Sequence, residues 1–421
     1  MAEFEAVVFG AGVRGTIYAD YALDHPEELN IVAVAEPDAE RREQFARNHS
    51  LRADRCFSSW EELLTAGTNG QVLINTTMDR MHHASTIAAI KAGYDVLLEK
   101  PMAPLLPENV ELVTVAEQHG RLLQICHVLR YTPFAQAVRR VIDGGTLGRI
   151  TSLDHRENLA YWHMAHSFVR GNWRNSEIAS PMILTKCCHD FDLLGWLLRR
   201  RVRRLNSFGS LTHFTSENAP DPQVPLRCSD GCPVASECKY DATRFYGQDT
   251  EGWPFDLVTP VADREARLEA LKVSPYGRCV YRCDNNVVDH QTVNMEYEDG
   301  TTATLVMNGQ GYEESRNLRI DGTRATLIAR FGEKQEITVY HHSGPEEKIP
   351  VQASDESGHG AGDTGLMRGF LDALRKGPGE STTTARESLE SHLLAFAAEQ
   401  SRLQYNVIDM EEFRRRNQAH E

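Results

Sequence analysis

Short apolar runs alternate with polar, helix-forming segments through the first third of the chain. The apolar runs have the length and β-branched content of buried strands, and they lie at residues 5–9, 31–36, 71–77, 94–99 and 122–128. Strands that alternate with helices pair in parallel through right-handed crossovers. Residues 1–128 are therefore expected to form an α/β domain of the doubly wound, Rossmann type.

The pattern changes after residue 128. A helix is expected at 134–142, and a glycine turn at 144–148 leads into a strand at 149–157. One main helix, at 190–198, and a series of β runs follow, at 202–212, 291–297, 301–307, 318–321, 325–330 and 336–341. Many strands with few helices indicate an α+β domain over residues 129–421, built on a large, mostly antiparallel open sheet.

Two segments of this second domain lie outside the strand pattern. Residues 214–285 are irregular and are interpreted as an insert, which holds five of the nine cysteines. Two amphipathic helices, at 364–376 and 384–403, are expected near the end of the chain.

Composition and charge narrow the class of protein. With 421 residues, of which 41% are hydrophobic and 25% charged, the chain has the composition of a two-domain globular protein. Its formal net charge of −15 argues against nucleic acid or an anionic membrane as a partner. No apolar run approaches the ~20 residues that span a bilayer, and the first strand begins too early to leave room for a signal peptide. A cytoplasmic protein is expected.

A glycine loop follows the first apolar run and opens a helix: Gly10-Ala11-Gly12-Val13-Arg14-Gly15. In the dinucleotide fingerprint, the first glycine makes the turn, the second lets the backbone approach the pyrophosphate, and the third lets helix and strand pack closely. The helix N-terminus then presents N–H groups and a partial positive charge to the phosphates. The alternative is an ordinary βα turn, but strand, glycines, helix, strand and acid follow one another in the order of a nucleotide site.

The acid of this fingerprint is Glu36, which closes the second apolar run. It lies about 20 residues past the glycines, where a carboxylate accepts hydrogen bonds from the adenosine ribose. A 2′-phosphate would meet like charge there, so NAD is favoured over NADP. Arg41 and Arg42 lie close enough to weaken this preference.

The run Leu98-Glu99-Lys100-Pro101 ends a strand at the carboxyl edge of the sheet, where open α/β proteins bind their ligands. A lysine placed there can donate a hydrogen bond to a reacting hydroxyl or carbonyl and stabilise its oxygen during hydride transfer. The alternative is a surface lysine paired with Glu99.

Several motifs occur together and favour the functional alternative. They are the glycine loop, Asn75-Thr76-Thr77 with His82, the strand end at Lys100, Arg130-Tyr131 with Pro133, Gly145 with Gly148, and His189 with Asp192-Leu-Leu. Together they resemble the family of glucose-fructose oxidoreductase, inositol dehydrogenase and MocA. The resemblance covers most of the chain. It implies NAD(P)-dependent oxidation or reduction of a sugar, cyclitol or related polyol, by a homo-oligomer, dimer or tetramer, whose open sheet forms the interface.

The resemblance also implies roles for single residues. Lys100 matches the lysine that holds the substrate oxygen, and His189 matches the histidine taken as acid or base, with helix capping or packing as its alternative role. Asp190 and Asp192 are expected to cap the helix at this point. The cofactor would be bound by the glycine loop with Val13 and Arg14, by Glu36, and by Asn75, Thr76, Thr77, His82, Glu99, Lys100 and Arg130.

One position departs from the family pattern. Many relatives carry an aspartate four residues before the histidine, and here that place is Thr185, followed by Lys186. Lys186 joins the catalytic and substrate-binding candidates because a second lysine could bind an acidic or carbonyl group, or lower the pKa of Lys100 through like-charge repulsion. The usual aspartate-histidine relay does not transfer directly.

Residues 156–174 are dense in aromatic, histidine and arginine side chains. Aromatic faces stack on the apolar face of a pyranose, and the polar side chains bond to its hydroxyls. A solvated loop over the domain junction is the alternative, as is a flexible linker for the glycine-rich loop that carries His359. The expected substrate wall comprises Asn158, Tyr161, Trp162, His163, His166, Arg170, Trp173, Lys186 and His359.

The cysteines of the insert are spaced as Cys228-x3-Cys232-x5-Cys238 and Cys279-x3-Cys283. Closely spaced thiolates suit a tetrahedral Zn²⁺, which would organise a segment poor in apolar residues. The expected ligands are Cys228, Cys232, Cys238 and Cys279, with Cys283 as the fifth candidate. An iron–sulfur cluster and free thiols or disulfides are the alternatives.

The main functional prediction is an NAD-dependent dehydrogenase acting on a carbohydrate or polyol. Some members of the family instead cleave glycosides without net redox change, through a transient keto-sugar. Tyr161, His163, His166 and Lys186 could supply the acids and bases for that reaction. A third possibility is an NAD-binding sensor without turnover, against which Lys100 and His189 argue.

Overall fold

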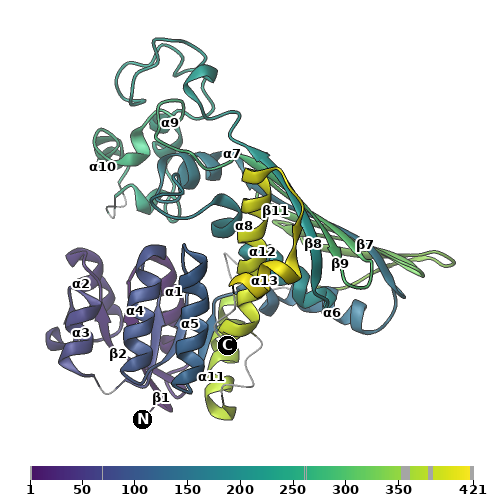
Figure 1. The fold of residues 1–421 in the computed structure, drawn as a ribbon. Helices are drawn as coiled ribbons and strands as arrows, with labels where there is room; N and C mark the ends of the chain where they lie inside the picture. Colours follow the sequence, from purple (N-terminus) through teal and green to yellow (C-terminus); the bar gives the residue numbers. More distant parts are fainter. Residues whose placement is uncertain are drawn as a thin grey trace.

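The computed structural model describes residues 2–68, 70–259, 261, 263–351, 361–377 and 383–417. An amino-terminal domain and a second domain with a long sheet lie side by side, and helices α8, α11 and α12 lie between them (Figure 1). Among the described residues, the longest apolar helical stretch falls short of what a membrane span needs.

Six parallel strands form the amino-terminal sheet, in the order β3-β2-β1-β4-β5-β6. This is the predicted doubly wound arrangement, which is confirmed. The strands are β1 Phe4–Phe9, β2 Leu29–Ala35, β3 Cys56–Phe57, β4 Val72–Asn75, β5 Asp95–Leu98 and β6 Leu123–Ile125. The helices between them are α1 Val13–Asp24, α2 Ala39–Asn48, α3 Trp60–Ala66, α4 Asp79–Lys91 and α5 Leu106–Gln118.

The second sheet has nine strands in the order β14-β13-β12-β11-β7-β10-β9-β8-β15. Strands β7 and β10 pair in parallel, and their neighbours pair antiparallel, as predicted. The strands are β7 Ile150–Ala160, β8 Val202–Ser210, β9 His290–Tyr297, β10 Thr302–Gly311, β11 Ser315–Gly322, β12 Ala325–Gly332, β13 Glu336–His341, β14 Glu346–Lys348 and β15 Ile408–Asp409.

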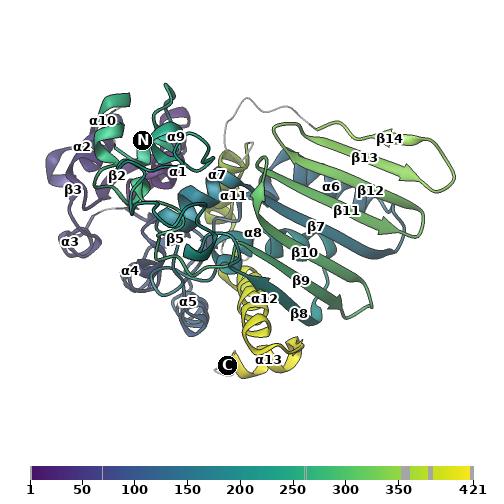
Figure 2. The ribbon, with the colours of Figure 1, turned by 90° about the horizontal axis from the view of Figure 1, so that it is seen from above.

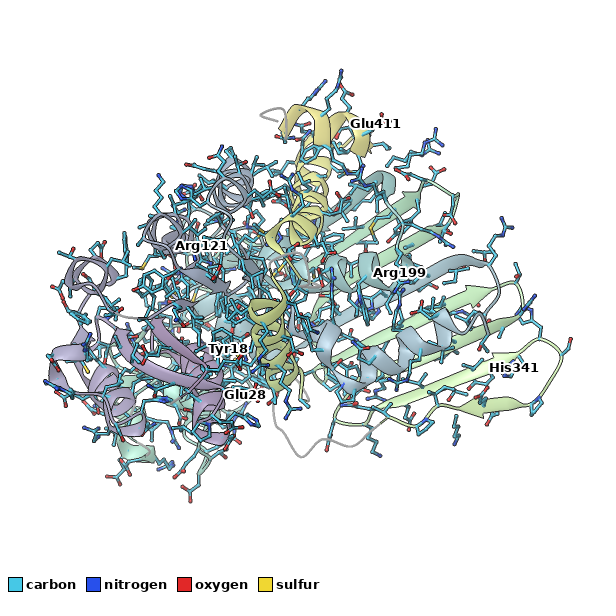
Figure 3. The ribbon with its side chains drawn as sticks, turned by 90° about the horizontal axis from the view of Figure 1, so that it is seen from below. Tyr18, Glu28, Arg121, Arg199, His341 and Glu411 are labelled. Atoms are coloured by element: carbon cyan, nitrogen blue, oxygen red, sulfur yellow. The ribbon has the colours of Figure 1, made fainter. Side chains whose placement is uncertain are left out.

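Helices cover one face of this sheet. Along β7, Leu153, His155 and Glu157 are buried, whereas Asp154 and Arg156 between them are exposed, which is the alternation of a sheet with one packed face. The packed face meets α6 (Pro133–Asp143), α8 (Met182–Leu198) and α12 (Ala385–Gln404). From below, helices lie across the sheet, and from above its other face is open to the viewer (Figures 2 and 3).

Helix α8 begins at Met182, eight residues before the predicted start at Asp190. His189, Asp190 and Asp192 therefore lie inside the helix, and the prediction that the two aspartates cap it is wrong. The apolar residues after Pro181 are buried and form the first turns of the helix, because α8 packs against both domains.

The insert between β8 and β9 contains only short helices, among them α9 (Ala242–Tyr246) and α10 (Arg264–Ala270). Its own core is small: Ala242, Tyr246, Phe255, Val258, Leu271 and Tyr276. The insert lies above the amino-terminal domain, on the side opposite the chain's N-terminus (Figure 1).

Helix α11 (Gly362–Lys376) returns to the amino-terminal domain. Its Leu366, Met367, Phe370 and Leu371 share a hydrophobic core with Tyr18 of α1, and Tyr18 lies beside this helix in Figure 3. Helix α12 packs between the two sheets, and α13 (Met410–Asn417) follows it after β15.

Candidate active site

The glycine loop has the shape that a dinucleotide site requires. Gly10 has φ +85°, and a Cβ on it would lie 2.8 Å from the carbonyl oxygen of Thr76. A Cβ on Gly15 would lie 2.0 Å from the carbonyl oxygen of Gly10, so only glycine fits there. Gly12 caps α1, and among the described residues a Cβ on it would meet open space within 4 Å. The loop therefore leaves room beside the helix N-terminus, where a pyrophosphate binds in this motif.

Glu36 is buried beside the loop. Its carboxylate accepts hydrogen bonds from the backbone N–H groups of Ala11 at 2.8 Å and Asp38 at 2.9 Å, and it pairs with Arg41 at 3.0 Å. Arg42 donates to the backbone carbonyl of Glu36. The acid therefore fixes the loop and neutralises Arg41, the nearer of the two arginines that weaken the preference for NAD.

Arg14 connects the loop to two other segments. Its guanidinium contacts Glu99 at 3.0 Å and Asp363 of α11 at 2.5 Å, and Tyr18 donates to the same Glu99 at 3.0 Å. Burial opposes the charge of Glu99, but Arg14 and Lys100 outweigh it and lower the pKa of this carboxyl. The glycine loop, the end of β5 and α11 are held together by these charges.

The residues at the strand ends that were expected at the cofactor form hydrogen bonds within the loops that follow the strands. Asn75 is fully buried and donates to Ser85 at 2.8 Å and Thr86 at 2.9 Å. The His82 ring bonds to the carbonyl oxygens of Pro101 at 2.8 Å and Thr77 at 2.9 Å, and the Thr76 hydroxyl donates to the Gly10 carbonyl at 2.7 Å. Direct contact of these side chains with a cofactor stays a prediction.

Lys100 follows β5 and reaches toward α8. Its ammonium donates to the backbone carbonyl of Thr185 at 3.3 Å, and Glu99 instead accepts from the Lys100 backbone N–H at 2.6 Å. The alternative of a surface lysine whose side chain pairs with Glu99 is therefore wrong. Thr185 and His189 are four residues apart and so lie one turn apart on the same face of α8. Lys100 therefore contacts α8 one turn before His189.

Arg130, which was expected at the cofactor, has an ion-pair partner in α8. It lies after β6 and forms a two-pronged ion pair with Asp192 of α8, with both contacts at 2.6 Å. Both residues are buried. The pair therefore ties the segment after β6 to α8. Contact of Arg130 with the cofactor stays a prediction.

His127 is a site residue that the sequence analysis missed. It is fully buried, and its ring lies edge-on to His189 with the ring centres 5.6 Å apart. Burial, with the charges of Arg130 and Lys100, holds the pKa of His127 well below its ordinary value. The signal was its place at the end of β6, on the same sheet edge as Lys100.

The other face of α8 carries an ion-pair network directed at the sheet. Lys186 pairs with Glu157 at 2.8 Å, and Arg316 contacts Glu157 at 2.8 Å and Asp190 at 2.9 Å. Burial opposes the charge on Lys186, but Glu157 outweighs it and raises the pKa of Lys186. The Lys186 ammonium is therefore held in an ion pair, and its catalytic and substrate-binding roles stay predictions.

The expected substrate wall folds into α7 (Tyr161–His163) and a π-helical segment, η3 (Met164–Arg170). Its first three residues are partly exposed, and His163 pairs with Glu314 at 2.8 Å. Such π-helical turns occur often at functional sites.

Two members of the predicted wall lie beneath the surface. His166 bonds to the Tyr246 hydroxyl at 2.6 Å and stacks on Tyr276 with the ring centres 4.4 Å apart. Arg170 donates to the carbonyl oxygens of Arg278 at 2.7 Å and Tyr240 at 2.6 Å. Both are buried and hold the insert to the second domain. Their contact with a substrate stays a prediction.

The remaining predicted wall residues lie at its borders. Asn158 bonds to Ser315 at 3.2 Å and Asn308 at 3.3 Å across the sheet. The Trp173 indole donates to Asp79 of α4 at 3.2 Å, so this segment reaches the amino-terminal domain. His359 lies outside the described residues.

The cysteines of the insert approach one another without forming a closed cluster. Cys228, Cys232, Cys238 and Cys279 line one small cavity together with Arg170, and all nine cysteines of the chain are free thiols. Among the described residues, no three of these sulfur atoms lie within 4.8 Å of one another. Cys283 is turned to the carbonyl of Cys279 at 3.3 Å, in keeping with its place as the fifth candidate.

Comparison with known proteins agrees with this architecture. Residues 4–127 match an oxidoreductase family described by its NAD-binding Rossmann fold, and residues 139–409 match the C-terminal alpha/beta domain of the same family. The protein YteT of Bacillus subtilis, named as an oxidoreductase, is 25% identical over 320 residues, 72% of this chain and 73% of YteT. Inositol 2-dehydrogenase 4 of Saccharopolyspora erythraea is 27% identical over 248 residues, 56% of this chain and 66% of that protein.

Solved structures share the fold at low sequence identity. An inositol dehydrogenase homologue from Azotobacter vinelandii, complexed with NAD⁺, superposes with a TM-score of 0.71 at 17% identity, covering 97% of both chains. An oxidoreductase from Agrobacterium radiobacter, in complex with NAD⁺, L-tartaric acid and magnesium, gives a TM-score of 0.70 at 15% identity, covering 98% of this chain and 99% of that one. The two family matches span nearly the whole chain, which therefore belongs to the oxidoreductase family of glucose-fructose oxidoreductase, inositol dehydrogenase and MocA.

Proposed function

We propose that this protein is an NAD-dependent dehydrogenase that oxidises a CH–OH group of a sugar, cyclitol or glycoside, or reduces the corresponding ketone. The single observation that carries the proposal is the contact of Lys100, at the end of β5, with the Thr185 carbonyl of α8, one turn before His189. The carboxyl edge of a parallel sheet is where such folds bind ligands.

Bound NAD would supply the acceptor for the hydride. Lys100 would donate a hydrogen bond to the substrate hydroxyl oxygen and stabilise the charge that develops on it. His189 would accept the hydroxyl proton in the oxidation and return it in the reduction. His127, kept neutral by its surroundings, would hold the His189 ring in position without adding a competing charge.

We also propose NAD over NADP. Glu36 is buried at the end of β2 with its carboxylate at the glycine loop, and its negative charge would repel a 2′-phosphate. Arg41 is already paired with Glu36, so it is a weaker phosphate ligand than its sequence position suggests.

A second candidate function is redox-neutral cleavage of a glycoside through a transient keto-sugar. The His163–Glu314 pair favours it, because the reaction needs an acid and a base besides Lys100 and His189. His163 lowers the pKa of Glu314 to about 2 despite burial. The pair thus places a charged carboxylate against an imidazole, and these two groups would serve as the additional acid and base.

One assay separates these functions. A panel of pyranoses, methyl pyranosides and cyclitols is incubated with NAD or NADP, and reduced cofactor and sugar products are both followed. A dehydrogenase forms reduced cofactor and keto-sugar in equal amounts, whereas the hydrolytic alternative releases the aglycone with no net reduced cofactor. Absence of both with every substrate would overturn the proposal and favour a sensor without turnover.

We further propose that the insert binds Zn²⁺ through Cys228, Cys232, Cys238 and Cys279. Their convergence on one cavity in a segment with a small core supports this role, although their side chains would have to rotate to bring the sulfurs together. Elemental analysis should find about one Zn per chain, lost on Cys228→Ser and kept on Cys56→Ser. Trace metal in the purified wild-type protein would remove the proposal.

We also propose that the protein is a cytoplasmic homo-oligomer. Phe208, Ile328 and Tyr340 on the open face of the second sheet are exposed, and such apolar surface suits a self-association face. Sedimentation velocity would give a dimer or tetramer, and a monomer at micromolar concentration would contradict it.

A further inference from the structure

Trp253 of the insert lies against the substrate wall. Its ring stands edge-on to His163, with the ring centres 4.8 Å apart and an interplanar angle of 78°. It also contacts the Trp162 ring at 5.4 Å. Trp162 in turn stacks on Phe245 of the insert at 5.7 Å. We call Trp162, His163 and Trp253 the aromatic shelf.

Trp253 is the exposed member of the shelf, whereas Trp162 and His163 are half-buried. Trp253 is 43% exposed, whereas Phe255, two residues later, is buried in the core of the insert. A tryptophan that is partly exposed keeps apolar ring surface in water, at a cost that a bound ring would remove. The sequence around Trp253 gave no periodic signal, so only the fold brings it to the wall.

The shelf borders the proposed reaction site. His163 bonds to Glu314 at 2.8 Å, and Glu314 also accepts from the backbone N–H of Ala160 at 2.9 Å. Ala160 ends β7, and Glu157 of the same strand pairs with Lys186 of α8 at 2.8 Å. Lys186 directly follows Thr185, whose carbonyl oxygen accepts from the Lys100 ammonium at 3.3 Å. A continuous set of contacts therefore runs from the shelf to the lysine that we propose holds the substrate oxygen.

The insert contacts the wall at a second place. The ammonium of Lys239 lies over the ring of Tyr161 at 5.2 Å and over that of Tyr240 at 4.9 Å. Together with the buried bonds of Arg170 and His166, this contact holds the insert to the wall. The position of Trp253 is thus fixed from both sides of α7.

We propose that the aromatic shelf is a subsite for a second ring of the substrate, the aglycone or neighbouring sugar of a glycoside, next to the ring that is oxidised. The inference rests on the proposed function and extends it. An exposed aromatic face stacks on the apolar face of a sugar or on an aromatic aglycone, and the polar His163 and Glu314 beside it can bond to hydroxyls. A single small polyol would leave the shelf uncovered.

The test uses substrate pairs that differ only in the second ring. Methyl and phenyl pyranosides of glucose, galactose, mannose and xylose are compared as substrates of the full-length protein with NAD, by following product formation. The variants are Trp253→Ala, the conservative Trp253→Phe, and Val273→Ala, which alters another exposed apolar residue of the insert. Thermal unfolding and NAD affinity are measured for each variant.

We expect wild type to prefer the phenyl member in kcat/KM, and Trp253→Ala to reduce that preference at least about tenfold, while kcat/KM for the methyl member changes less than about threefold. Trp253→Phe should recover most of the preference, and Val273→Ala should leave it unchanged. An unchanged preference in Trp253→Ala, or an equal loss for both members, would overturn the subsite while leaving the dehydrogenase intact. A wild type inactive on every pyranoside would overturn the proposed function, and this inference with it.

Discussion

The Lys100 ammonium lies 3.3 Å from the backbone carbonyl oxygen of Thr185, one helical turn before His189. This contact joins the end of β5 in one domain to the first turn of α8 in the other. It therefore depends on the two domains staying docked. Activity would therefore depend on the residues that hold the two domains together as well as on Lys100 and His189.

The Arg130–Asp192 pair ties the segment after β6 to α8, and both residues are buried. Removing Asp192 takes away the two-pronged partner of a buried guanidinium, whose next carboxylate, Glu387, lies 3.8 Å away. Asp192→Ala should therefore lower the free energy of unfolding by about 3–5 kcal/mol, as expected for a broken buried pair. Urea unfolding measures it. The exposed pair of Arg204 and Glu296 is the control, because Arg204→Ala should cost about 0–1 kcal/mol. Equal losses in the two variants would contradict the docking role.

The glycine loop gives a matched pair of variants. Gly12→Ala should fold like wild type, because the added Cβ meets open space among the described residues. It should nevertheless weaken NAD binding at least about tenfold, or about 1.4 kcal/mol, by filling the space that the pyrophosphate needs.

Gly15→Ala should behave differently, because its Cβ would clash with the Gly10 carbonyl oxygen at 2.0 Å. We expect this variant to lose thermal stability as well as NAD affinity. Calorimetric titration and thermal unfolding separate the two effects. A Gly12→Ala protein that binds NAD as wild type does would contradict the placement of the cofactor.

The buried His392 predicts a dependence of stability on pH. Burial and the neighbouring His127 lower the pKa of His392 from 6.5 to about 3. Between these two values the ring binds a proton in the unfolded state and stays neutral in the folded state. The free energy of unfolding therefore decreases as pH falls from above 6.5 toward 3.

His392→Gln should flatten the dependence of stability on pH, because an amide does not titrate in this range. The variant should still fold, because the amide can accept from the Met102 N–H and donate to the Ser388 carbonyl, as the ring does. Thermal unfolding between pH 7 and 5 provides the measurement. The exposed His119 is the control, and His119→Gln should keep the wild-type slope. A His392→Gln variant with the wild-type slope would show that other groups set the acid response.

Much of the fold follows from local pattern. The alternation of apolar runs and helices predicted the parallel sheet, and the many β runs with few helices predicted the mostly antiparallel sheet. The start of α8 was missed because the residues from Met182 to Leu184 are apolar and buried, so no polar position marks the first turn. They are buried by contacts from both domains, which no local window contains.

The site was predictable in part for the same reason. Lys100 and the glycine loop are marked by strand ends and spacing, so their positions could be inferred. His166 and Arg170 have side chains that could bind a ligand, but they form hydrogen bonds with residues of the insert. Arg130 forms an ion pair with Asp192. Trp253 lies 90 residues from His163 in sequence, yet their rings touch. Which polar side chains are bonded within the protein depends on contacts between residues far apart in the sequence.

The most direct test of the central claim is the turnover of Lys100→Ala on the substrate that the panel identifies, measured together with its NAD affinity. We predict NAD binding within about twofold of wild type and a loss of turnover of at least about a hundredfold, as for removal of one positioned hydrogen-bonding group. Lys91→Ala, an exposed lysine at the end of α4, should retain full activity. Wild-type turnover in Lys100→Ala would contradict the claim that this lysine holds the reacting oxygen.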